Sequence, residues 1–272
     1  MIVLPAQDFS LAHTLASGQV FRWHADNGGY VGLIGRTAVT AHQAGERLAI
    51  ETDGAVDAER LRRYFALDQD LPTILRAIDV DPTIHDAIQS YAGLRIIRQD
   101  LWECLASFIL SSFNNITRLQ GMIERLCRRF GARHNGHHWW TFPEPAAIAG
   151  APERTLRALG LGFRAPYLKA AARLMADGRL DAARLRRLSY DEAKEILLTV
   201  PGVGDKVADC IALFGLQRYE AFPIDVWTER VLRGYVRRRP TRTRLHQFAR
   251  RHFGPYAGYA QQYLYHHARH AG

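Results

Sequence analysis

Residues 197–215, LLTVPGVGDKVADCIALFG, constrain the fold more than any other part of the 272-residue chain. An apolar helix end meets the turn Pro-Gly-Val-Gly at 201–204, and a second helix is predicted to begin near Lys206. Two glycines allow a tight turn and let another surface approach the backbone without a Cβ in the way. The outward N–H groups and the helix dipole favour phosphate there. A plain helical hairpin also favours Gly and Pro, so the motif alone is weak evidence for phosphate binding.

Composition limits the class of protein. Apolar residues make up 47% of the chain, a normal globular share that excludes wholesale disorder. No stretch approaches the run of about 20 apolar residues that spans a bilayer. The start, MIVLPAQDFS, has no basic segment and no small-residue cleavage site, so we expect no secretory signal. Cys104, Cys127 and Cys210 are too few for a disulfide scaffold or a four-cysteine metal site, which favours a reducing, cytoplasmic setting.

The positive charge comes almost wholly from arginine. The formal net charge is +9, from 36 Lys and Arg against 27 Asp and Glu. Lys169, Lys194 and Lys206 are the only lysines, and arginine is the side chain that forks onto phosphate. The densest arginine run comprises Arg230, Arg233, Arg237, Arg238, Arg239, Arg242, Arg244, Arg250 and Arg251. A nucleic-acid footprint and a solvated helix face explain this run equally well.

The hydrophobic period changes near residue 100. Before it, alternating segments around Asn27-Gly28 predict a hairpin, with further strands at 37–40 and 48–52 and a helix at 58–64. After it, the period is helical. Helices are predicted from Leu101 to Ile109, from Ile116 to Phe130, and at 153–159, 164–177, 191–199, 206–214, 226–236 and 257–269. We therefore expect an α+β fold: an antiparallel sheet lobe with helices over 1–99, with the C-terminal helix near it, and an all-helical body over 100–272.

Lys206 stands out because arginine is the default cation of this chain. It lies in the first turn of the predicted second helix, where the positive end of the dipole favours a neutral amine. A neutral amine can attack an electrophilic carbon and form a Schiff base. A simple phosphate contact is the commoner role for an isolated lysine, and both interpretations remain open.

Asp225 follows nineteen residues later, in the segment Phe-Pro-Ile-Asp-Val-Trp. It precedes a helical pattern, so it is predicted to be an N-cap. Position N3 is Thr228 rather than Glu or Gln, so we expect no full capping box. A carboxylate held there can stabilise a developing cation and assist proton transfer, whereas the alternative is a cap with no further role.

Five segments together resemble one family. GVGDKVADC at 202–210, followed by PIDV at 223–226, resembles the helix–hairpin–helix–Gly/Pro–Asp signature of DNA glycosylases. More narrowly, it is similar to the 8-oxoguanine DNA glycosylase/AP lyase branch. The other similar segments are SGQVFRW at 17–23, RQD at 98–100 through SSFNNI at 111–116, LGLGFRA at 159–165 and GPYAGYAQ at 254–261. They cover the chain nearly end to end and occur in the order typical of the family.

The resemblance implies a base-excision-repair enzyme that flips out and excises 8-oxoguanine from duplex DNA. Lys206 would attack C1′ of the damaged nucleotide, and the Schiff base would permit β-elimination, with Asp225 as the catalytic carboxylate. Gly18 would offer its carbonyl to the N7–H of 8-oxoguanine, whereas guanine would present a lone pair there. We expect the partner to be duplex DNA that contains oxidised guanine. We also expect the protein to be a monomer that does not associate with membranes and whose chemistry needs no metal or organic cofactor.

The resemblance also implies how the base is held. Cys210 and Tyr265 would lie on the two sides of the flipped base, and Gln261 would read its Watson–Crick edge. The alternative is that Cys210 and Tyr265 are core residues and Gln261 is a surface amide. Further DNA contacts are implied for Gly202, Val203, Gly204, Asn115, Phe113, Arg118, Arg164 and Trp227. Within this set, Arg118 and Arg164 would contact the orphaned base, and Asn115 would lie near the gap left by flipping. Outside the set, Arg22 and Trp23 would support the Gly18 loop.

Four positions depart from the family pattern. Animal and fungal members have a third Asn, which reads the opposite cytosine, where this chain has Phe113; Phe163 stands where Tyr is usual. Because Phe113 can stack in the gap but cannot hydrogen-bond, we expect a relaxed preference for the opposite base. Trp227 and Ala268 replace a His–Asp pair that contacts phosphate. That contact must be made differently, and the cluster Arg230–Arg239 is the candidate.

Two other functions compete with this prediction. A monofunctional alkyl-base glycosylase of the same fold would use water activated by Asp225, and Lys206 argues against it. The iron–sulfur glycosylases of the superfamily are excluded by the cysteine count. A non-catalytic helix–hairpin–helix DNA-binding protein would explain the charge and the hairpin, but not the coincidence of Gly18, Asp225 and Gln261 with the family pattern.

Overall fold

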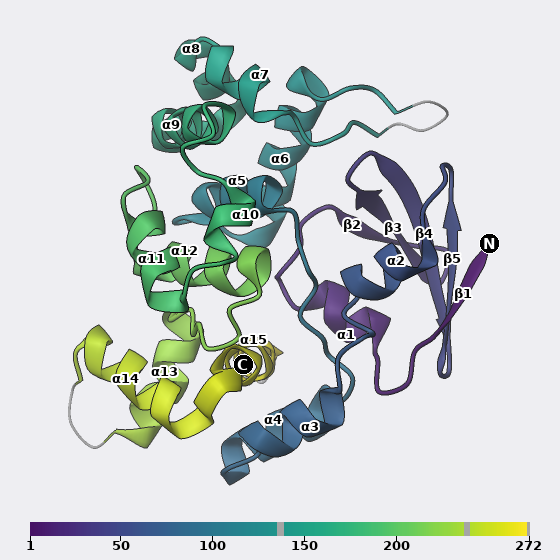
Figure 1. Ribbon diagram of the computed structural model, residues 1–272, viewed down its shortest axis with the longest axis vertical. Coiled ribbons are helices and arrows are strands. Elements are labelled where there is room, and N and C mark those ends of the chain that lie inside the picture. Colours follow the sequence, from purple (N-terminus) through teal and green to yellow (C-terminus); the bar gives the residue numbers. More distant parts are fainter. Residues whose placement is uncertain (135–138, 237–239, 271–272) are drawn as a thin grey trace.

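A five-stranded antiparallel sheet forms one side of the molecule and helices form the other (Figure 1). The computed structural model describes residues 1–134, 139–236 and 240–270. Arg237, Arg238 and Arg239 of the arginine run lie outside the described residues. The strand order is β1-β5-β4-β3-β2, with β1 (Ile2–Pro5), β2 (Trp23–Asp26), β3 (Gly29–Ile34), β4 (Thr37–Ala44) and β5 (Arg47–Thr52). The predicted α+β fold class is confirmed.

The predicted hairpin joins β2 and β3 through a two-residue turn. Asp26 pairs with Gly29, and the intervening Asn27 and Gly28 have φ values of +43° and +78°. Positive φ at both central positions gives the turn a twist that matches paired strands, and Asn-Gly is the sequence that adopts it at least cost. The edge strand β1 was not predicted. Its four residues are too few to show the alternation of apolar and polar residues that indicates a strand. The strand is specified instead by its pairing with β5, in which Ile2 lies opposite Ile50.

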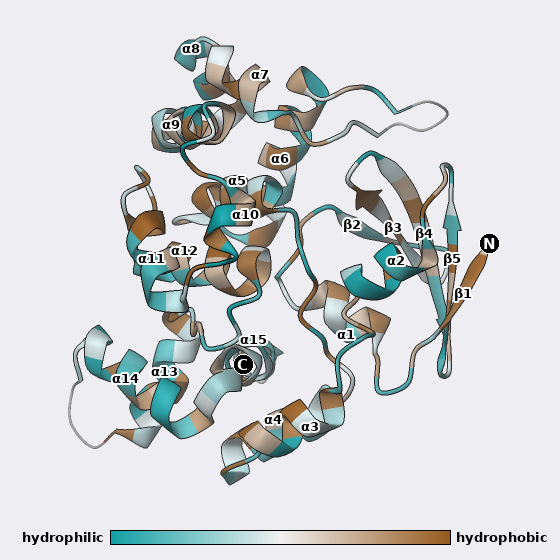
Figure 2. Ribbon diagram, in the orientation of Figure 1, coloured by the Kyte–Doolittle hydropathy of each residue, from teal (hydrophilic) through white to brown (hydrophobic). Residues whose placement is uncertain are grey.

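Two short helices cover the inner face of the sheet. They are α1 (Leu11–Ala16) and α2 (Ala58–Tyr64), the second with the predicted bounds. Leu48 and Ile50 of β5 are fully buried and belong to the same apolar cluster as Leu11, Leu61 and Phe65. In Figure 2 the edge strand β1 is coloured hydrophobic, whereas α2 is largely hydrophilic. The sheet thus has a small core of its own.

The helical side is built from thirteen further α-helices in the described residues. They are α3 (Leu71–Ile78), α4 (Pro82–Ser90), α5 (Leu101–Ser111), α6 (Ile116–Phe130), α7 (Pro145–Gly150), α8 (Glu153–Leu156), α9 (Ala165–Ala176), α10 (Ala182–Leu185), α11 (Tyr190–Leu198), α12 (Asp205–Cys210), α13 (Val226–Tyr235), α14 (Arg242–Phe253) and α15 (Ala257–His270). None of the described helices is both long and apolar enough to cross a bilayer.

Helices α3 and α4 were missed by the periodicity argument although both carry start signals. Asp70 accepts a hydrogen bond from Thr73 N at 3.1 Å, and Asp81 accepts one from Thr83 N at 2.9 Å. Each helix also has a proline in its first turn, where the missing N–H costs nothing. Their apolar residues join the core of the helical body rather than that of the sheet. Helices of eight or nine residues offer only two turns of period, so caps are the better signal.

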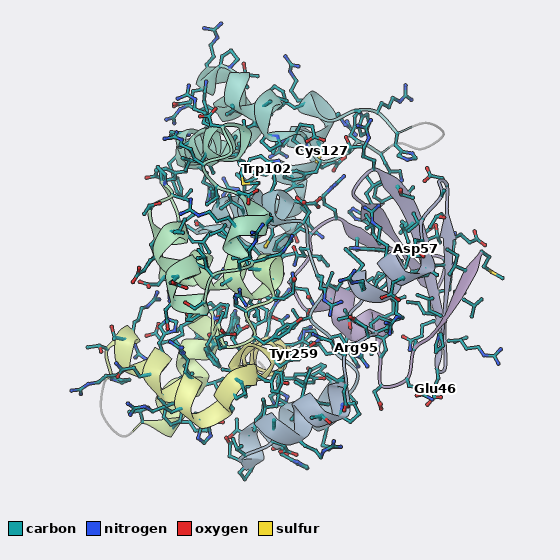
Figure 3. All side chains as sticks on the ribbon, in the orientation of Figure 1. Glu46, Asp57, Arg95, Trp102, Cys127 and Tyr259 are labelled. Carbon is teal, nitrogen blue, oxygen red and sulfur yellow. The ribbon has the colours of Figure 1, made fainter. Side chains whose placement is uncertain are left out.

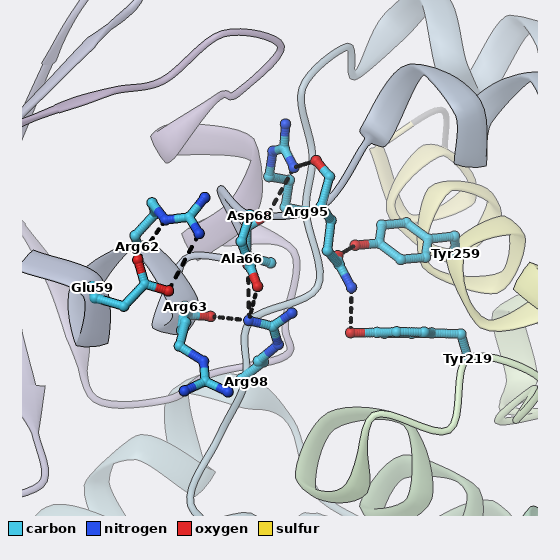
Figure 4. Close-up of polar contacts among 10 residues, drawn as sticks. Glu59, Arg62, Arg63, Ala66, Asp68, Arg95, Arg98, Tyr219 and Tyr259 are labelled. Carbon is cyan, nitrogen blue, oxygen red and sulfur yellow. Dashed lines mark hydrogen bonds and ion pairs between the residues drawn. The ribbon is translucent and has the colours of Figure 1, made fainter.

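Helix α15 lies at the centre of the molecule, where it contacts α3, α4, α13 and α14 (Figure 1). Tyr259, fully buried on this helix, lies near Arg95 of the segment that crosses from the sheet lobe (Figure 3). Gln69 bridges the two parts, because its side chain hydrogen-bonds to both Tyr219 and Tyr259 (Figure 4). Beside it, Arg98 pairs with Asp68 at 2.7 Å. The contact between Gln69 and Tyr259 fixes the C-terminal helix against the N-terminal lobe.

Candidate active site

The predicted hairpin connects α11 to α12. Gly202 has φ +84°, and a Cβ there would lie 2.5 Å from Cγ of Tyr167, so both backbone and packing require glycine. Gly204, by contrast, has an extended backbone, caps α12 and faces open space. Val203 is buried, and its N–H donates to the Val200 carbonyl at 3.0 Å. The turn therefore exposes backbone at its two glycines while Val203 anchors it.

Lys206 and Cys210 lie one turn apart on α12. Lys206 is half-buried, and its Nζ is 5.2 Å from the centroid of the Phe108 ring. Burial raises the pKa of the Cys210 thiol to about 11; the nearby Lys206 ammonium opposes this rise and the Asp225 carboxylate adds to it. The three side chains are therefore within electrostatic reach of one another. Among the described residues, no ion pair joins Lys206 to Asp225.

Asp225 is the N-cap of α13, as predicted. Its Oδ1 accepts hydrogen bonds from the backbone N–H of Trp227 at 3.1 Å and of Thr228 at 2.9 Å. The Thr228 hydroxyl in turn accepts from the Asp225 N–H at 2.9 Å, which closes a capping box. The expectation of no capping box was wrong, because a threonine hydroxyl at N3 reaches the N-cap N–H as Glu or Gln would. Within the described residues Oδ2 makes no hydrogen bond, so one carboxylate oxygen is fixed and the other is free.

The Gly18 loop lies against Tyr265. Gly18 has φ +77°, and a Cβ there would be 3.3 Å from two atoms of the Tyr265 ring and hydroxyl. Gln19 holds the loop from behind: its amide donates to the Arg95 carbonyl at 2.8 Å and accepts from Ile97 N at 2.7 Å. Gln262 donates to the Ser17 carbonyl at 2.8 Å. In the described residues the Gly18 carbonyl itself accepts no hydrogen bond.

Arg22 and Trp23 support this loop structurally. Arg22 donates to the Trp140 carbonyl at 2.5 Å and lies 3.4 Å from Glu103. The Trp23 indole donates to the Tyr64 hydroxyl at 2.8 Å. Both side chains are buried, so neither is available to DNA.

Helix α15 brings Gln261 and Tyr265 to the same face. Gln261 is only 4% exposed, and its Oε1 has no hydrogen-bond partner among the described residues. The alternative that Gln261 is a surface amide is therefore wrong. Burial raises the pKa of Tyr265, Arg269 opposes the rise, and Asp225 and Lys206 also act on it. Tyr265 is thus within electrostatic reach of the lysine and the carboxylate, and the same helix carries a buried amide oxygen that lacks a partner in the described residues.

A separate loop carries Phe113. This residue has φ +50° and is 94% exposed, an unusual combination for a bulky apolar side chain. Arg164, only 5% exposed, donates from Nε to the Ser112 carbonyl at 2.8 Å and from Nη2 to the Phe113 carbonyl at 3.0 Å. Burial, followed by the charge of Arg118, lowers the pKa of Arg164. In the DNA-free protein Arg164 therefore secures the loop from inside.

The aromatic rings near Phe113 form a row. Phe113 and Phe163 meet edge to face with centroids 6.4 Å apart, and Phe163 and Tyr167 do so at 6.5 Å. The Arg164 guanidinium lies 4.3 Å from the Phe163 centroid. Tyr167, which covers Gly202, was missed by the sequence analysis. The i, i+4 spacing of Phe163 and Tyr167 was the signal that could have identified it.

Asn115 and Arg118 lie beside this row at the start of α6. Asn115 is the N-cap, and its Oδ1 accepts from Arg118 N at 2.8 Å. Both side chains are exposed. Ile116, next to the cap, would lie 3.4 Å from a Cβ on Gly18, so the start of α6 adjoins the pocket.

The described part of the arginine run is partly neutralised. Glu229 pairs with Arg233 at 2.6 Å and with Arg242 at 3.4 Å, and Arg250 pairs with Asp191 at 3.0 Å. Arg230 lies 5.0 Å from the Trp227 ring centroid and has no acidic partner in the described residues. Only part of the run therefore presents unpaired charge, beginning beside Trp227.

The reactive groups do not lie in the cavity between the lobe and the body. That cavity measures about 800 Å³ and is lined by Arg22, Trp102 and Glu103 among others, but by none of the predicted catalytic or base-recognition residues. In the described residues no cluster of His, Cys, Asp or Glu is arranged to hold a metal ion. The candidate site is instead formed by residues of α12, α13, α15 and the Gly18 loop.

A helix–hairpin–helix followed by a buried Gly/Pro–Asp segment and joined to an antiparallel N-terminal lobe defines a class of DNA-repair proteins. Two family profiles match the chain: 8-oxoguanine DNA glycosylase, N-terminal domain, over residues 1–105, and HhH-GPD superfamily base excision DNA repair protein over residues 106–251. The chain therefore belongs to the HhH-GPD superfamily, in the N-glycosylase/DNA lyase family with the 8-oxoguanine glycosylase N-terminal domain.

Relatives over the full length agree with this placement. A probable N-glycosylase/DNA lyase of Methanothermobacter thermautotrophicus is 32% identical over 99% of this chain and 96% of its own. MBOgg1, solved with a low-affinity DNA ligand, has a TM-score of 0.94 and 36% identity over 99% and 96% of the two chains. The Clostridium acetobutylicum 8-oxoguanine glycosylase/lyase, solved with DNA carrying cytosine opposite 8-oxoguanine, has a TM-score of 0.91 and 31% identity over 100% and 98%. The predicted enzyme class, a bifunctional DNA glycosylase/lyase, is confirmed.

Proposed function

We propose that this protein excises 8-oxoguanine from duplex DNA, with Lys206 as the nucleophile and Asp225 as the catalytic carboxylate. The observation that supports the proposal is that both groups, at the starts of α12 and α13, lie within electrostatic reach of Cys210 and Tyr265. The net charge of +9 suits a polyanionic partner. The enzyme would act as a monomer in the cytoplasm, and its three free, buried cysteines fit a reducing compartment.

The chemistry follows from the placement of the two groups. The Lys206 amine attacks C1′ of the flipped nucleotide as the C1′–N9 bond breaks, and the electron pair of that bond leaves with the base. The attached amine gives a proton to the departing base. The C1′–O4′ bond then breaks, O4′ keeps the electron pair and takes a proton from water, and the nitrogen lone pair forms a protonated Schiff base with C1′. Loss of a C2′ proton then expels the 3′ phosphate by β-elimination. The free oxygen of Asp225 stabilises the cationic sugar while Oδ1 stays fixed by the cap.

Lesion recognition would rest on groups that lack partners before DNA binds. The Gly18 carbonyl is aimed by the rigid Gln19 loop, and 8-oxoguanine offers it the N7–H that guanine lacks. The buried Oε1 of Gln261 would accept from the Watson–Crick edge of the base, while Cys210 and Tyr265 enclose its faces. A base that leaves buried acceptors unpaired is rejected strongly, because each unpaired group costs about 1–3 kcal/mol.

Contacts to the opposite strand would rely on shape. Phe113 is already exposed and fixed by Arg164, so it can enter the gap left by the flipped base without rearrangement. An aromatic ring stacks on any base, which supports a relaxed opposite-base preference. Arg118 and Asn115 would flank the gap. The backbone of the hairpin would bind a phosphate, through Gly202, Val203 and Gly204. Trp227 and Arg230 would lie next to the following phosphate.

Borohydride trapping on a duplex with one 8-oxoguanine tests the proposal. Reduction of the Schiff base should yield a covalent protein–DNA adduct, absent with undamaged duplex and absent from Lys206→Gln, which should still bind DNA. Base release without an adduct would indicate water as the nucleophile. Neither adduct nor release from the wild-type protein would reject 8-oxoguanine as the substrate.

A further inference from the structure

Asp209 is a fully buried carboxylate on α12 that the chemistry above does not use. Its Oδ1 accepts a hydrogen bond from the Tyr190 hydroxyl at 2.6 Å and lies 2.9 Å from Lys194 Nζ. Its Oδ2 has no hydrogen-bond partner in the described residues, and Nε2 of His246 lies 3.5 Å away. A buried carboxylate is normally satisfied at both oxygens, so this arrangement requires an explanation.

The network around Asp209 joins three helices. Lys194 also lies 3.6 Å from Asp205 Oδ1, the first residue of α12 after the hairpin. The charged and titratable groups that face Asp209 or its partners are Tyr190, Asp191 and Lys194 on α11, Asp205 on α12, and Arg242, His246 and Arg250 on α14. The network therefore runs from the exposed hairpin to the buried side of the helix that carries Lys206 and Cys210.

Asp209 is ionised at neutral pH at a cost to the fold. Burial raises its pKa to about 6, against the opposing effect of Lys194, and burial lowers the pKa of His246 to about 4. A carboxyl whose folded pKa exceeds its unfolded value contributes stability only at low pH, and that contribution is lost as pH rises through about 6. Stability alone therefore does not account for a charge at this position, since apolar residues often replace buried ion pairs without loss.

We propose that Asp209, as a carboxylate paired with Lys194, is a positioning residue that fixes the rotation of α12 and so aims Lys206 and Cys210 at the flipped nucleotide. At about 100° per residue, Asp209 is turned about 100° from Cys210 and about 60° from Lys206, so its pair with Lys194 can fix the rotation of the helix from beside the face that carries them. The proposal rests on the function proposed above, because Lys206 is the group being aimed. A reacting group displaced by about 1 Å loses about 100-fold in rate.

Three variants and one matched control test this role. Asp209→Asn keeps the shape and removes the charge, Lys194→Met leaves the carboxylate unpaired, and the double variant removes both charges. Asp191→Asn is the control, because it breaks the exposed pair with Arg250 between α11 and α14 and leaves the buried Asp209–Lys194 pair between α12 and α11 in place. Single-turnover excision, duplex affinity and Tm are measured for each.

We expect each single variant to slow excision about 10- to 100-fold while duplex affinity stays within about twofold of the control. The double variant should be no slower than Asp209→Asn, because the two residues act as one unit. Asp209→Asn should not lower Tm. Parallel losses of Tm, affinity and rate would instead make the network merely structural and overturn the proposal.

The pH profile supplies a readout that a structural role would not move. Relative to the control, wild-type excision should fall as pH drops through about 6, where Asp209 is protonated. Lys194→Met should shift that fall toward neutral pH, because an unpaired buried carboxylate protonates more readily. Asp209→Asn should show no such fall. Identical profiles in all proteins would reject the proposal, whereas a wild-type protein that forms no adduct would reject the proposed function instead.

Discussion

The lesion pocket and the Phe113 loop are adjacent yet built on opposite principles. The pocket buries one acceptor without a partner in the described residues, Oε1 of Gln261, and the cap of α13 fixes one carboxylate oxygen of Asp225. The loop exposes an apolar ring and ties its own arginine to backbone carbonyls. Unpaired buried acceptors discriminate by hydrogen bonding, whereas an exposed ring contacts any base. The comparison predicts that the enzyme selects the lesion strictly but accepts different bases opposite it.

The largest expected effect comes from Gly18→Ala. The added Cβ would occupy left-handed backbone and lie 3.3 Å from Tyr265, so it should displace the carbonyl and reduce single-turnover excision by about 100-fold. Gly28→Ala is the matched control, because its φ of +78° imposes the same strain while no atom lies within 4 Å. Both variants should lose about 1 kcal/mol of stability. Equal activity of the two would break the assignment of Gly18 to the pocket.

Gln261→Leu should act next most strongly. Loss of the buried acceptor should slow 8-oxoguanine excision by about 10-fold, corresponding to about 1.4 kcal/mol. Strand cleavage at a preformed abasic site needs no base contact and serves as the internal control. A variant that slows both reactions equally would show that Gln261 supports the fold of α15 rather than reading the base.

Lowering the pH should reduce the stability of the fold through His266 on α15. Burial, followed by the charges of His270 and His13, lowers the pKa of His266 to about 4. Because the unfolded chain binds the proton first, stability from His266 is present above about 6.5 and is lost as pH falls toward 4. The Tm of His266→Gln should therefore depend less on pH between 6.5 and 4.5 than that of wild type. His42→Gln, on β4, controls for removal of a histidine, and equal slopes in the two variants would contradict the prediction.

The smallest effect is expected at Phe113. Asn tolerates a positive φ and can hydrogen-bond, so Phe113→Asn should raise excision opposite cytosine relative to adenine by about 3- to 10-fold. Phe113→Ala removes the ring without adding a donor, and should slow both duplexes alike. A cytosine preference that is unchanged in Phe113→Asn would mean that another residue reads the opposite base.

Local signals predicted the pocket better than the loop. The hairpin glycines, the N-cap at Asp225 and the long helical periods can be seen in sequence, because each depends on neighbours within a few residues. The role of Arg164 cannot, because its partners are carbonyls about fifty residues away. The edge strand β1 and the buried charge at Asp209 likewise depend on contacts that only the tertiary structure supplies. The Thr228 capping box is local, and it was missed because only Glu or Gln was expected at its third position.

One measurement tests the comparison most directly. Single-turnover excision would be timed on four duplexes, with 8-oxoguanine or guanine placed opposite cytosine or adenine. The account predicts rates for 8-oxoguanine that differ by less than about tenfold between the two partners, and release of guanine at least about a thousandfold slower with either. A hundredfold preference for cytosine would contradict the tolerance assigned to the Phe113 loop, and comparable release of guanine would contradict the selectivity assigned to the pocket.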